Sequence, residues 1–99
     1  MKFYIGQQVE HIRFNYRGVV YDVDQEFNGT EEWYKRMAVS KPPKDQPWYH
    51  VLVHEADHTT YVSERNLRPY GGKDYIDHPL LPSFFDGFKA GTYFRRDRH

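Results

Sequence analysis

Two runs of alternating apolar residues, 17–24 and 48–55, limit what this chain can fold into more than any other feature. In the first run Val19, Tyr21 and Val23 share one face of an extended chain, with the period of two that a half-buried strand requires. The second run carries apolar side chains on both faces, which is typical of a strand at the centre of a sheet. Together the runs predict a β-sheet core with residues 48–55 near its middle.

Weaker patterns predict a hairpin partner for each of these strands. Residues 8–14 form a candidate strand, and Asn15-Tyr16 can turn it back into the run 17–24. Residues 59–64 are rich in β-branched and aromatic side chains and follow a turn at residues 56–58. Four or five short strands joined by close turns predict a mainly β protein, a small antiparallel β-barrel in which strand closure hides the sheet edges.

One short helical insertion is predicted between the two hairpins. Thr30 can cap this helix, and the two glutamates that follow suit its positive N-terminus. Pro42-Pro43 cannot continue it, so the helix should end near Val39. From Asn66 onward, glycines and prolines interrupt a segment with scattered leucines and phenylalanines, which predicts a C-terminal segment that wraps the barrel.

Length and cysteine content exclude several classes of protein. The 99 residues predict a single domain, 1–99. The absence of cysteine excludes a disulfide framework, a thiolate metal ligand and a cysteine nucleophile. The sequence contains no long apolar run and no signal-peptide start, so we expect a cytoplasmic protein, in the cytosol or at the nucleoid, with no membrane partner.

The charge balance requires any DNA-binding surface to be local. Fourteen lysines and arginines offset fourteen aspartates and glutamates, so the chain as a whole does not attract phosphate. A candidate DNA- or partner-binding patch combines cations near the first hairpin and the helix with aromatic and imidazole groups. Its members are Arg13, Arg17, Lys35, Arg36, Lys41, Lys44, Trp48 and His50, with Trp33 and Tyr34 between them. The alternative is an ordinary solvated helix face, on which Glu31 and Glu32 pair with Lys35 and Arg36.

Residues 54–58 read His-Glu-Ala-Asp-His and match the H-E-x-x-H pattern of zinc proteases. That chemistry requires a helix, on which the two histidines lie one turn apart and reach the same ion. The preceding residues 51–53 favour a strand, in which the histidines would lie about 13 Å apart unless a turn brought them together. The favoured interpretation is two solvent-exposed histidines at a hairpin end, with a zinc hydrolase as the alternative. We therefore predict no metal and no cofactor.

No other group of residues predicts catalysis. His11 and His50 lie in predicted strands, where a structural hydrogen bond is the favoured role and a metal or pH-sensing cluster the alternative. Asp22, Asp24 and Glu26 would suit Mg²⁺ or acid–base chemistry, or would satisfy the backbone of a turn. The sequence has no glycine-rich phosphate loop and no serine in a nucleophile setting, so no catalytic residue is predicted.

Several motifs occur in the order in which a known family carries them. They are Gly6-Gln7 with Val9 and His11, residues 16–24, Glu32-Trp33, residues 45–53, residues 61–67 and His78-Pro79. Over about residues 3–88 the chain resembles the YccV-like hemimethylated-DNA-binding family, which includes the heat-shock protein HspQ. The basic C-terminal tail, 89–99, lies outside the resemblance.

The resemblance implies an SH3-like β-barrel with no enzymatic activity that binds hemimethylated DNA. In this hypothesis Arg13, Arg17 and the lysines near the helix exit contact phosphates, while Trp48 or His50 approaches a base. For the heat-shock members the resemblance also implies a role in regulating the Lon protease. The same family sequence occurs attached to F-box proteins, which favours a protein-recognition surface as the alternative. Leftover apolar surface would also allow a homo-oligomer to form.

Overall fold

The computed structural model describes residues 1–95, and two antiparallel β-sheets dominate it. In chain order the elements are β1 (Gln8–His11), β2 (Arg17–Asp24), α1 (Glu31–Met37), β3 (Trp48–Val53), β4 (Thr59–Ser63), the 3₁₀ helix η1 (Glu64–Asn66), β5 (Leu67–Pro69), α2 (Leu81–Phe84), β6 (Gly87–Lys89) and β7 (Thr92–Phe94). The predicted mainly β, antiparallel architecture is confirmed.

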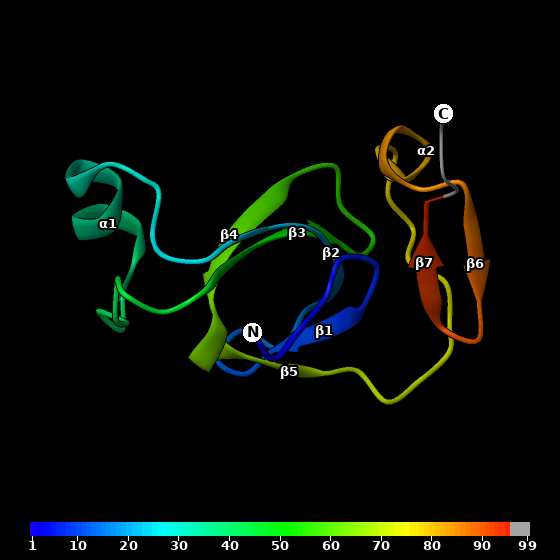
Figure 1. Cartoon of the computed structure of the whole chain (residues 1–99), viewed down its shortest axis with the longest axis horizontal. Helices are drawn as coiled ribbons and strands as arrows, with labels where there is room; N and C mark the ends of the chain where they lie inside the picture. Colours follow the sequence, from blue (N-terminus) through cyan, green and yellow to red (C-terminus); the bar gives the residue numbers. More distant parts are fainter. Residues whose placement is uncertain (96–99) are drawn as a thin grey trace.

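The larger sheet curls around the core and has the strand order β4-β3-β2-β1-β5. Both predicted hairpins are present: β1 pairs with β2, with Gln8 opposite Val19, and β3 pairs with β4, with His50 opposite Tyr61. Figure 1 shows α1 at one end of this sheet and α2 with the β6–β7 hairpin at the other. The molecule therefore has two ends that differ in structure.

Alternation along the strands fills the inside of the curled sheet. The predicted common face of Val19, Tyr21 and Val23 is wrong, because an irregularity between Val20 and Asp22 of β2 puts Val23 on the side of Val20, whereas Val19 and Tyr21 pack on the other side. The buried side chains of this core are Phe3, Val9, Val20, Tyr49, Val51, Val62 and Leu67. They come from β1 to β5 and from the N-terminal segment, and all of them are β-branched, aliphatic or aromatic. Burying this apolar surface is the main source of stability in so small a domain.

The second apolar face of β3 explains why this strand is central. At one end of the strand Leu52 packs with Val19 of β2 against the C-terminal segment, including Phe85 and Tyr93. At the other end Trp48 lies under α1. The C-terminal segment thus wraps the outside of the sheet, as the sequence predicts, and it also forms the β6–β7 hairpin, which the sequence pattern did not indicate.

The helix and the first strand are shorter than predicted. The Thr30 hydroxyl accepts a hydrogen bond from the Trp33 N–H (3.1 Å), as the predicted cap requires, but α1 ends at Met37, before Val39. β1 ends at His11 because the His11 imidazole accepts hydrogen bonds from the two backbone N–H groups at 13 and 14, and so folds these residues into a turn. Within residues 1–95 no helix has the length and apolarity to span a membrane.

The two outer strands of the larger sheet, β4 and β5, do not pair with each other. A hydrogen bond between the hydroxyls of Tyr16 and Thr60 (2.7 Å) links the β1–β2 turn to β4. The strand closure expected from the sequence is therefore not made by backbone hydrogen bonds within residues 1–95, and β4 keeps a free edge.

Candidate nucleic-acid interface

A groove of about 350 Å³ lies beside β4, at the α1 end of the molecule. It is lined by all five residues of β4, by residues of the β1–β2 turn such as Phe14 and Tyr16, and by the end of α1 with the residues that follow it. Phe14, Met37 and Val39 are each more than half exposed. The groove is therefore bordered by apolar side chains that water can reach.

Hydrogen bonds tie the segments around this groove together. The Ile12 N–H donates to the Asn66 carbonyl (2.8 Å), which joins the β1–β2 turn to η1. The Arg65 guanidinium donates to the Ser40 carbonyl (2.8 Å), and the Asn66 side-chain amide donates to the Ser40 hydroxyl (3.2 Å). Three segments that are far apart in the sequence are thus held around one groove.

Five exposed cations lie on the segments that border the groove, and we call them the basic rim. They are Arg13, Lys35, Arg36, Lys41 and Arg65. Arg13 lines the groove itself; Arg36, Lys41 and Arg65 each adjoin a lining residue in the sequence; and the Lys41 ammonium donates to the Lys35 carbonyl (3.3 Å). No aspartate or glutamate of residues 1–95 lines the groove, although Glu10, Glu32 and Glu64 adjoin lining residues in the same way as the cations do. The groove lining itself is positive through Arg13, on a chain whose net charge is zero.

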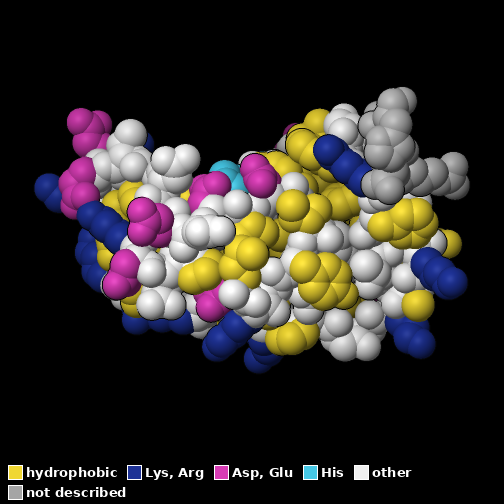
Figure 2. All heavy atoms as spheres, in the orientation of Figure 1, with side chains coloured by type: hydrophobic (Ala, Val, Ile, Leu, Met, Phe, Trp, Pro, Cys, Tyr) yellow, Lys and Arg dark blue, Asp and Glu magenta, His cyan; other side chains and the backbone are white. Residues whose placement is uncertain are grey.

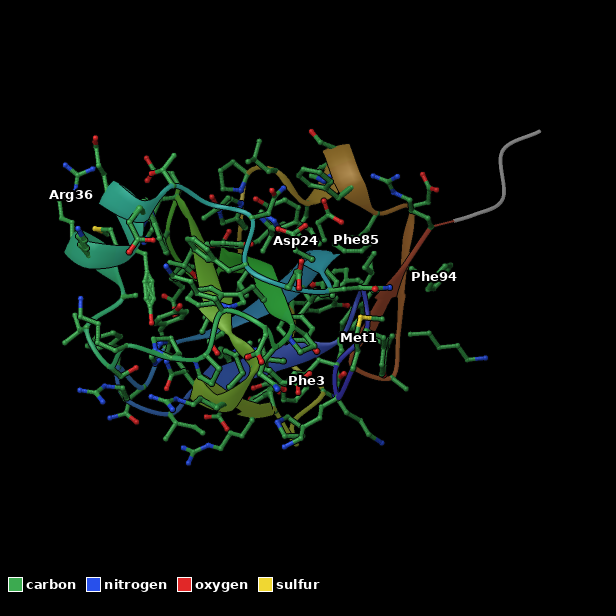
Figure 3. All side chains as sticks on the ribbon, turned by 60° about the vertical axis from the view of Figure 1, so that its left-hand side comes forward. Met1, Phe3, Asp24, Arg36, Phe85 and Phe94 are labelled. Carbon is green, nitrogen blue, oxygen red and sulfur yellow. The ribbon has the colours of Figure 1, made fainter. Side chains whose placement is uncertain are left out.

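The space-filling view shows that both signs of charge occur at the α1 end of the molecule. Figure 2 shows Lys and Arg side chains along the lower edge and at the left end of the molecule, where Asp and Glu are interspersed, while hydrophobic side chains cross the middle. In Figure 3 the side chain of Arg36 extends outward from α1, and Phe94 lies on the other side of the view. The Arg36 side chain is therefore directed toward solvent.

Arg17 belongs to the predicted patch, but its guanidinium is already engaged within the fold. It donates to the Gln8 side-chain oxygen (2.7 Å) and to the Tyr75 carbonyl (2.8 Å), and it lies 4.7 Å from the centre of the Tyr70 ring. These contacts fasten the C-terminal segment to the sheet. Arg17 is therefore a structural residue, and its charge is less available to phosphate than that of Arg13.

Lys44 is also partly neutralised within the fold. Its ammonium pairs with the Glu31 carboxylate and lies 4.4 Å from the centre of the Tyr34 ring. This pairing resembles the solvated helix face that the sequence offers as an alternative, although the partner of Glu31 is Lys44 and not Lys35. Lys44 therefore contributes less free positive charge than its position in the sequence suggests.

The two ring-bearing members of the predicted patch lie at different depths. Trp48 is only 2% exposed, and its indole N–H donates to the Pro43 carbonyl (3.1 Å), so its ring supports the groove from the core. His50 is half-buried: its Nε2 lies 3.0 Å from an Asp24 carboxylate oxygen, and its ring lies 4.5 Å from that of Tyr61. Of the two rings, only that of His50 has contact with solvent.

Asp24 organises the polar contacts near His50. It accepts hydrogen bonds from the Tyr61 hydroxyl (2.6 Å) and from His50, and the Tyr61 hydroxyl accepts one from the Asn28 N–H (2.9 Å). Burial by itself would raise the pKa of Asp24, but these two hydrogen bonds outweigh it and lower the pKa, while burial and the Asp24 carboxylate raise the pKa of Tyr61. Asp24 is therefore a structural carboxylate that anchors the chain before α1.

The H-E-x-x-H sequence lies in the turn between β3 and β4 and not on a helix. His54 is half-buried and engaged within the fold. Its Nδ1 accepts a hydrogen bond from the Asp77 N–H (2.9 Å), and its Nε2 lies 3.0 Å from the Glu55 carboxylate and 3.2 Å from the Arg17 guanidinium. Only His58 has the solvent exposure that we expected for both histidines. Within residues 1–95 no group of three or more potential metal ligands comes together, and the zinc interpretation therefore has no structural basis.

His11 and His78 have similar structural roles. The Nδ1 of His11 accepts two backbone N–H groups at 3.1 Å each, and burial, followed by the guanidinium of Arg13, lowers the pKa of His11 below its ordinary value. The Nδ1 of His78 accepts the Leu80 N–H (3.1 Å), while its Nε2 bonds the His58 carbonyl (2.9 Å). These contacts satisfy the imidazoles within the fold, which is the role favoured for His11 from the sequence.

Sequence reasoning missed several residues of the groove. Arg65 completes the basic rim, and Phe14, Met37 and Val39 supply its exposed apolar side chains. No short-range pattern marks them, because they come together through the turn at 12–16, the chain after α1 and η1.

A comparison with protein-family models adds evidence that is independent of this geometry. The model described as "Hemimethylated DNA-binding protein YccV like" matches residues 1–92 of the chain. The match includes the larger sheet, both helices, η1 and β6, and every residue of the basic rim lies inside it.

Proposed function

Since the chain belongs to the YccV-like hemimethylated DNA-binding family, we propose that it is a non-catalytic module that binds hemimethylated duplex DNA along the basic rim. The observation that supports this location is the groove lining, which includes Arg13 and no carboxylate of residues 1–95, together with four further exposed cations on the segments that border it. A soluble DNA-binding protein of this kind would act in the cytoplasm or at the nucleoid.

The charge density of DNA makes such a rim sufficient on a neutral protein. Duplex DNA carries one negative charge per about 1.7 Å of its axis, so a few local cations bind it by releasing counterions. Arg13 and Arg65 would contact phosphates through planar guanidinium groups, and Lys35, Arg36 and Lys41 would add to them from α1 and the chain that follows. His50 is the predicted residue whose ring remains in contact with solvent near the groove.

The salt dependence of DNA binding tests this proposal. If the five rim cations each neutralise one phosphate, the plot of log affinity against log salt concentration should have a slope of about −4.5. The double variant Arg13→Ala with Lys41→Ala should reduce the slope by about 2, because each lost phosphate contact removes about 0.9. Fluorescence anisotropy with a labelled hemimethylated duplex, between about 50 and 200 mM salt, measures both quantities.

A matched control distinguishes the rim from cations elsewhere. Lys73 and Lys89 lie near the β6–β7 hairpin, at the other end of the molecule (Figure 1), and replacing both with alanine removes the same charge. This control should keep the slope of the unmodified protein. Equal losses of slope in the two double variants, or a slope near zero for the unmodified protein, would contradict the rim as the DNA-binding surface.

A second candidate function is that of an adaptor for the Lon protease. It is favoured by the exposed apolar side chains of Phe14, Met37 and Val39, which a pure DNA-binding surface does not require. In this case the protein should change the rate at which purified Lon degrades a client protein, and Met37→Ser with Val39→Ser should reduce that change. Identical degradation rates with and without the protein would remove this candidate.

A further inference from the structure

The free edge of β4 presents unpaired backbone groups to the groove. Within residues 1–95, β4 pairs with β3 on one side and with no strand on the other. Two hydrogen bonds at the ends of the β3–β4 pair show which backbone groups of β4 face β3. The Glu64 N–H donates to the Pro47 carbonyl (3.0 Å), and the Val53 N–H donates to the His58 carbonyl (3.5 Å). In an antiparallel pair, residues that face the partner strand alternate with residues that face away. The residues of β4 that direct their N–H and C=O groups away from β3 are Thr59, Tyr61 and Ser63.

These three residues differ in how far solvent can reach them. Thr59 is exposed, Tyr61 is half-buried and Ser63 is 1% exposed. The Ser63 hydroxyl is buried and has no hydrogen-bond partner among the described residues. The accessible part of the edge therefore runs from Thr59 to Tyr61, and the buried Ser63 lines the same groove.

The two edges of the sheet differ in how they are protected. Natural proteins block exposed sheet edges with charged side chains, proline or a covering segment, because an open edge pairs readily with another chain. β5 contains Arg68 and Pro69, which serve this purpose. β4 reads Thr-Thr-Tyr-Val-Ser and contains neither a charged residue nor a proline. The hydrogen bond between Tyr16 and Thr60 beside this edge joins two side chains and leaves the backbone of β4 without a second strand partner within residues 1–95. The open edge of β4 is therefore an available site for pairing.

We propose that this edge binds an extended peptide segment of another protein, which adds to the sheet as a strand beside β4. Backbone hydrogen bonds to Thr59 and Tyr61 would supply the pairing. Alternate side chains of the peptide would contact Phe14, Met37 and Val39, the exposed apolar residues of the groove. This ligand is a polypeptide, so the inference goes beyond the proposed DNA binding and does not depend on it.

Charge and hydrogen-bond geometry both favour this ligand. Arg13 lines the groove, and no aspartate or glutamate of residues 1–95 does, while the other rim cations lie on the bordering segments. The best ligand therefore has apolar residues at alternate positions and acidic residues at its flanks. Successive outward-facing residues of a strand lie about 7 Å apart. Each offers one donor and one acceptor, an arrangement that the backbone of an extended peptide matches.

Amide hydrogen exchange measured by NMR tests this inference without DNA. The probe is a blocked nine-residue peptide of alternating valine and threonine with a glutamate at each end. Binding of this peptide should slow exchange of the Thr59 and Tyr61 amides about tenfold or more, because both become hydrogen-bonded. A matched peptide with proline in place of each threonine lacks the necessary N–H groups and should leave both rates unchanged.

Two variants and a control show whether the edge and the groove act together. Thr59→Pro removes one outward N–H group at a position where an edge strand tolerates proline, and Val39→Lys places a charge in the groove without disturbing the core. Each should weaken binding of the peptide about tenfold or more, whereas Tyr75→Lys, at an exposed aromatic residue outside the groove, should not.

Several results would overturn the inference. One is the absence of peptide binding to the unmodified protein. Another is slowed exchange of the Thr59 and Tyr61 amides in concentrated protein without peptide, which would assign the edge to a second copy of this chain. A third is protection of these amides by a hemimethylated duplex but not by the peptide.

Discussion

Replacing Trp48 with alanine is expected to lower the free energy of unfolding by about 4 kcal/mol, in the range observed for buried tryptophans. The side chain is 2% exposed, and its ring centre lies within 5.2 Å of those of Phe27 and Tyr61. Its indole N–H also holds the Pro43 carbonyl, which follows α1 in the chain. The substitution therefore removes the packing between α1 and β3 and one anchor of the chain after α1.

Thermal unfolding followed by circular dichroism measures this effect. For a domain of this size, a loss of about 4 kcal/mol corresponds to a fall in Tm of roughly 20 °C. Trp48→Phe retains an aromatic ring and loses only the hydrogen bond and part of the volume. Its Tm should therefore fall by about a third as much as that of Trp48→Ala. If Trp48→Ala lowered Tm by less than about 5 °C, α1 would not depend on this contact.

The same substitution has a functional consequence. Trp48 and Ala38 lie in one cluster under α1, and both also line the groove. At temperatures at which Trp48→Ala remains folded, α1 should be less well fixed, and binding that uses Lys35 and Arg36 should weaken. Trp48 was predicted as a residue that approaches a base; its burial gives it instead the role of a support for the residues around the groove.

The sequence predicted those parts of the fold that depend on local pattern. Alternation over residues 17–24 and 48–55 marked the two longest strands, and Thr30 marked the start of the helix, because each signal comes from neighbouring residues. The β6–β7 hairpin was not predicted. Its three-residue strands are too short for alternation to distinguish them from a loop.

The candidate interface depended on long-range contacts that no local pattern records. Arg13 and Arg17 lie four positions apart, yet one is exposed and the other is held by the carbonyl at residue 75. Arg65 joins the basic rim because η1 carries it to Ser40. A run of residues indicates which charges exist, and only the fold determines which of them remain free.

The H-E-x-x-H match shows the same limit for metal sites. The spacing of His54 and His58 suits zinc only when the backbone is helical, and these residues lie in a hairpin turn. The sequence context already favoured this outcome, because the preceding β-branched residues predict a strand. The partners of His54, at residues 17 and 77, come from distant segments and gave no signal in the sequence.

Gly6→Ala is expected to destabilise the protein by about 3 kcal/mol or more, because two costs add. Gly6 has a φ of 97°, a conformation that residues with a side chain rarely adopt. An added Cβ would also overlap the Tyr93 carbonyl oxygen of β7. That region cannot move away easily, because the Tyr93 N–H donates to the Gly6 carbonyl (2.9 Å) and the Gly6 N–H donates to the Val20 carbonyl (2.8 Å).

Gly71→Ala provides a matched control for this substitution. A Cβ at Gly71 has no neighbour within 4 Å, and φ there lies outside the positive range, so alanine should be neutral or stabilise by up to about 1 kcal/mol. Urea unfolding of the two variants compares them directly. Equal midpoints for both would contradict the idea that Gly6 is the junction between the sheet and the C-terminal segment.

The location of Gly6 predicts how its replacement acts on function. It contacts β7, which lies in Figure 1 at the end of the molecule remote from α1, whereas the basic rim lies on the segments that border the groove beside β4. Below its own Tm, Gly6→Ala should therefore expose residues 70–95 to proteolysis while the salt slope of DNA binding stays near that of the unmodified protein. Trp48→Ala should have the opposite pattern, since its loss loosens α1 and leaves the contacts of β7 intact. A loss of DNA binding in Gly6→Ala equal to that in Trp48→Ala would mean that the C-terminal segment, and not the rim alone, carries the interface.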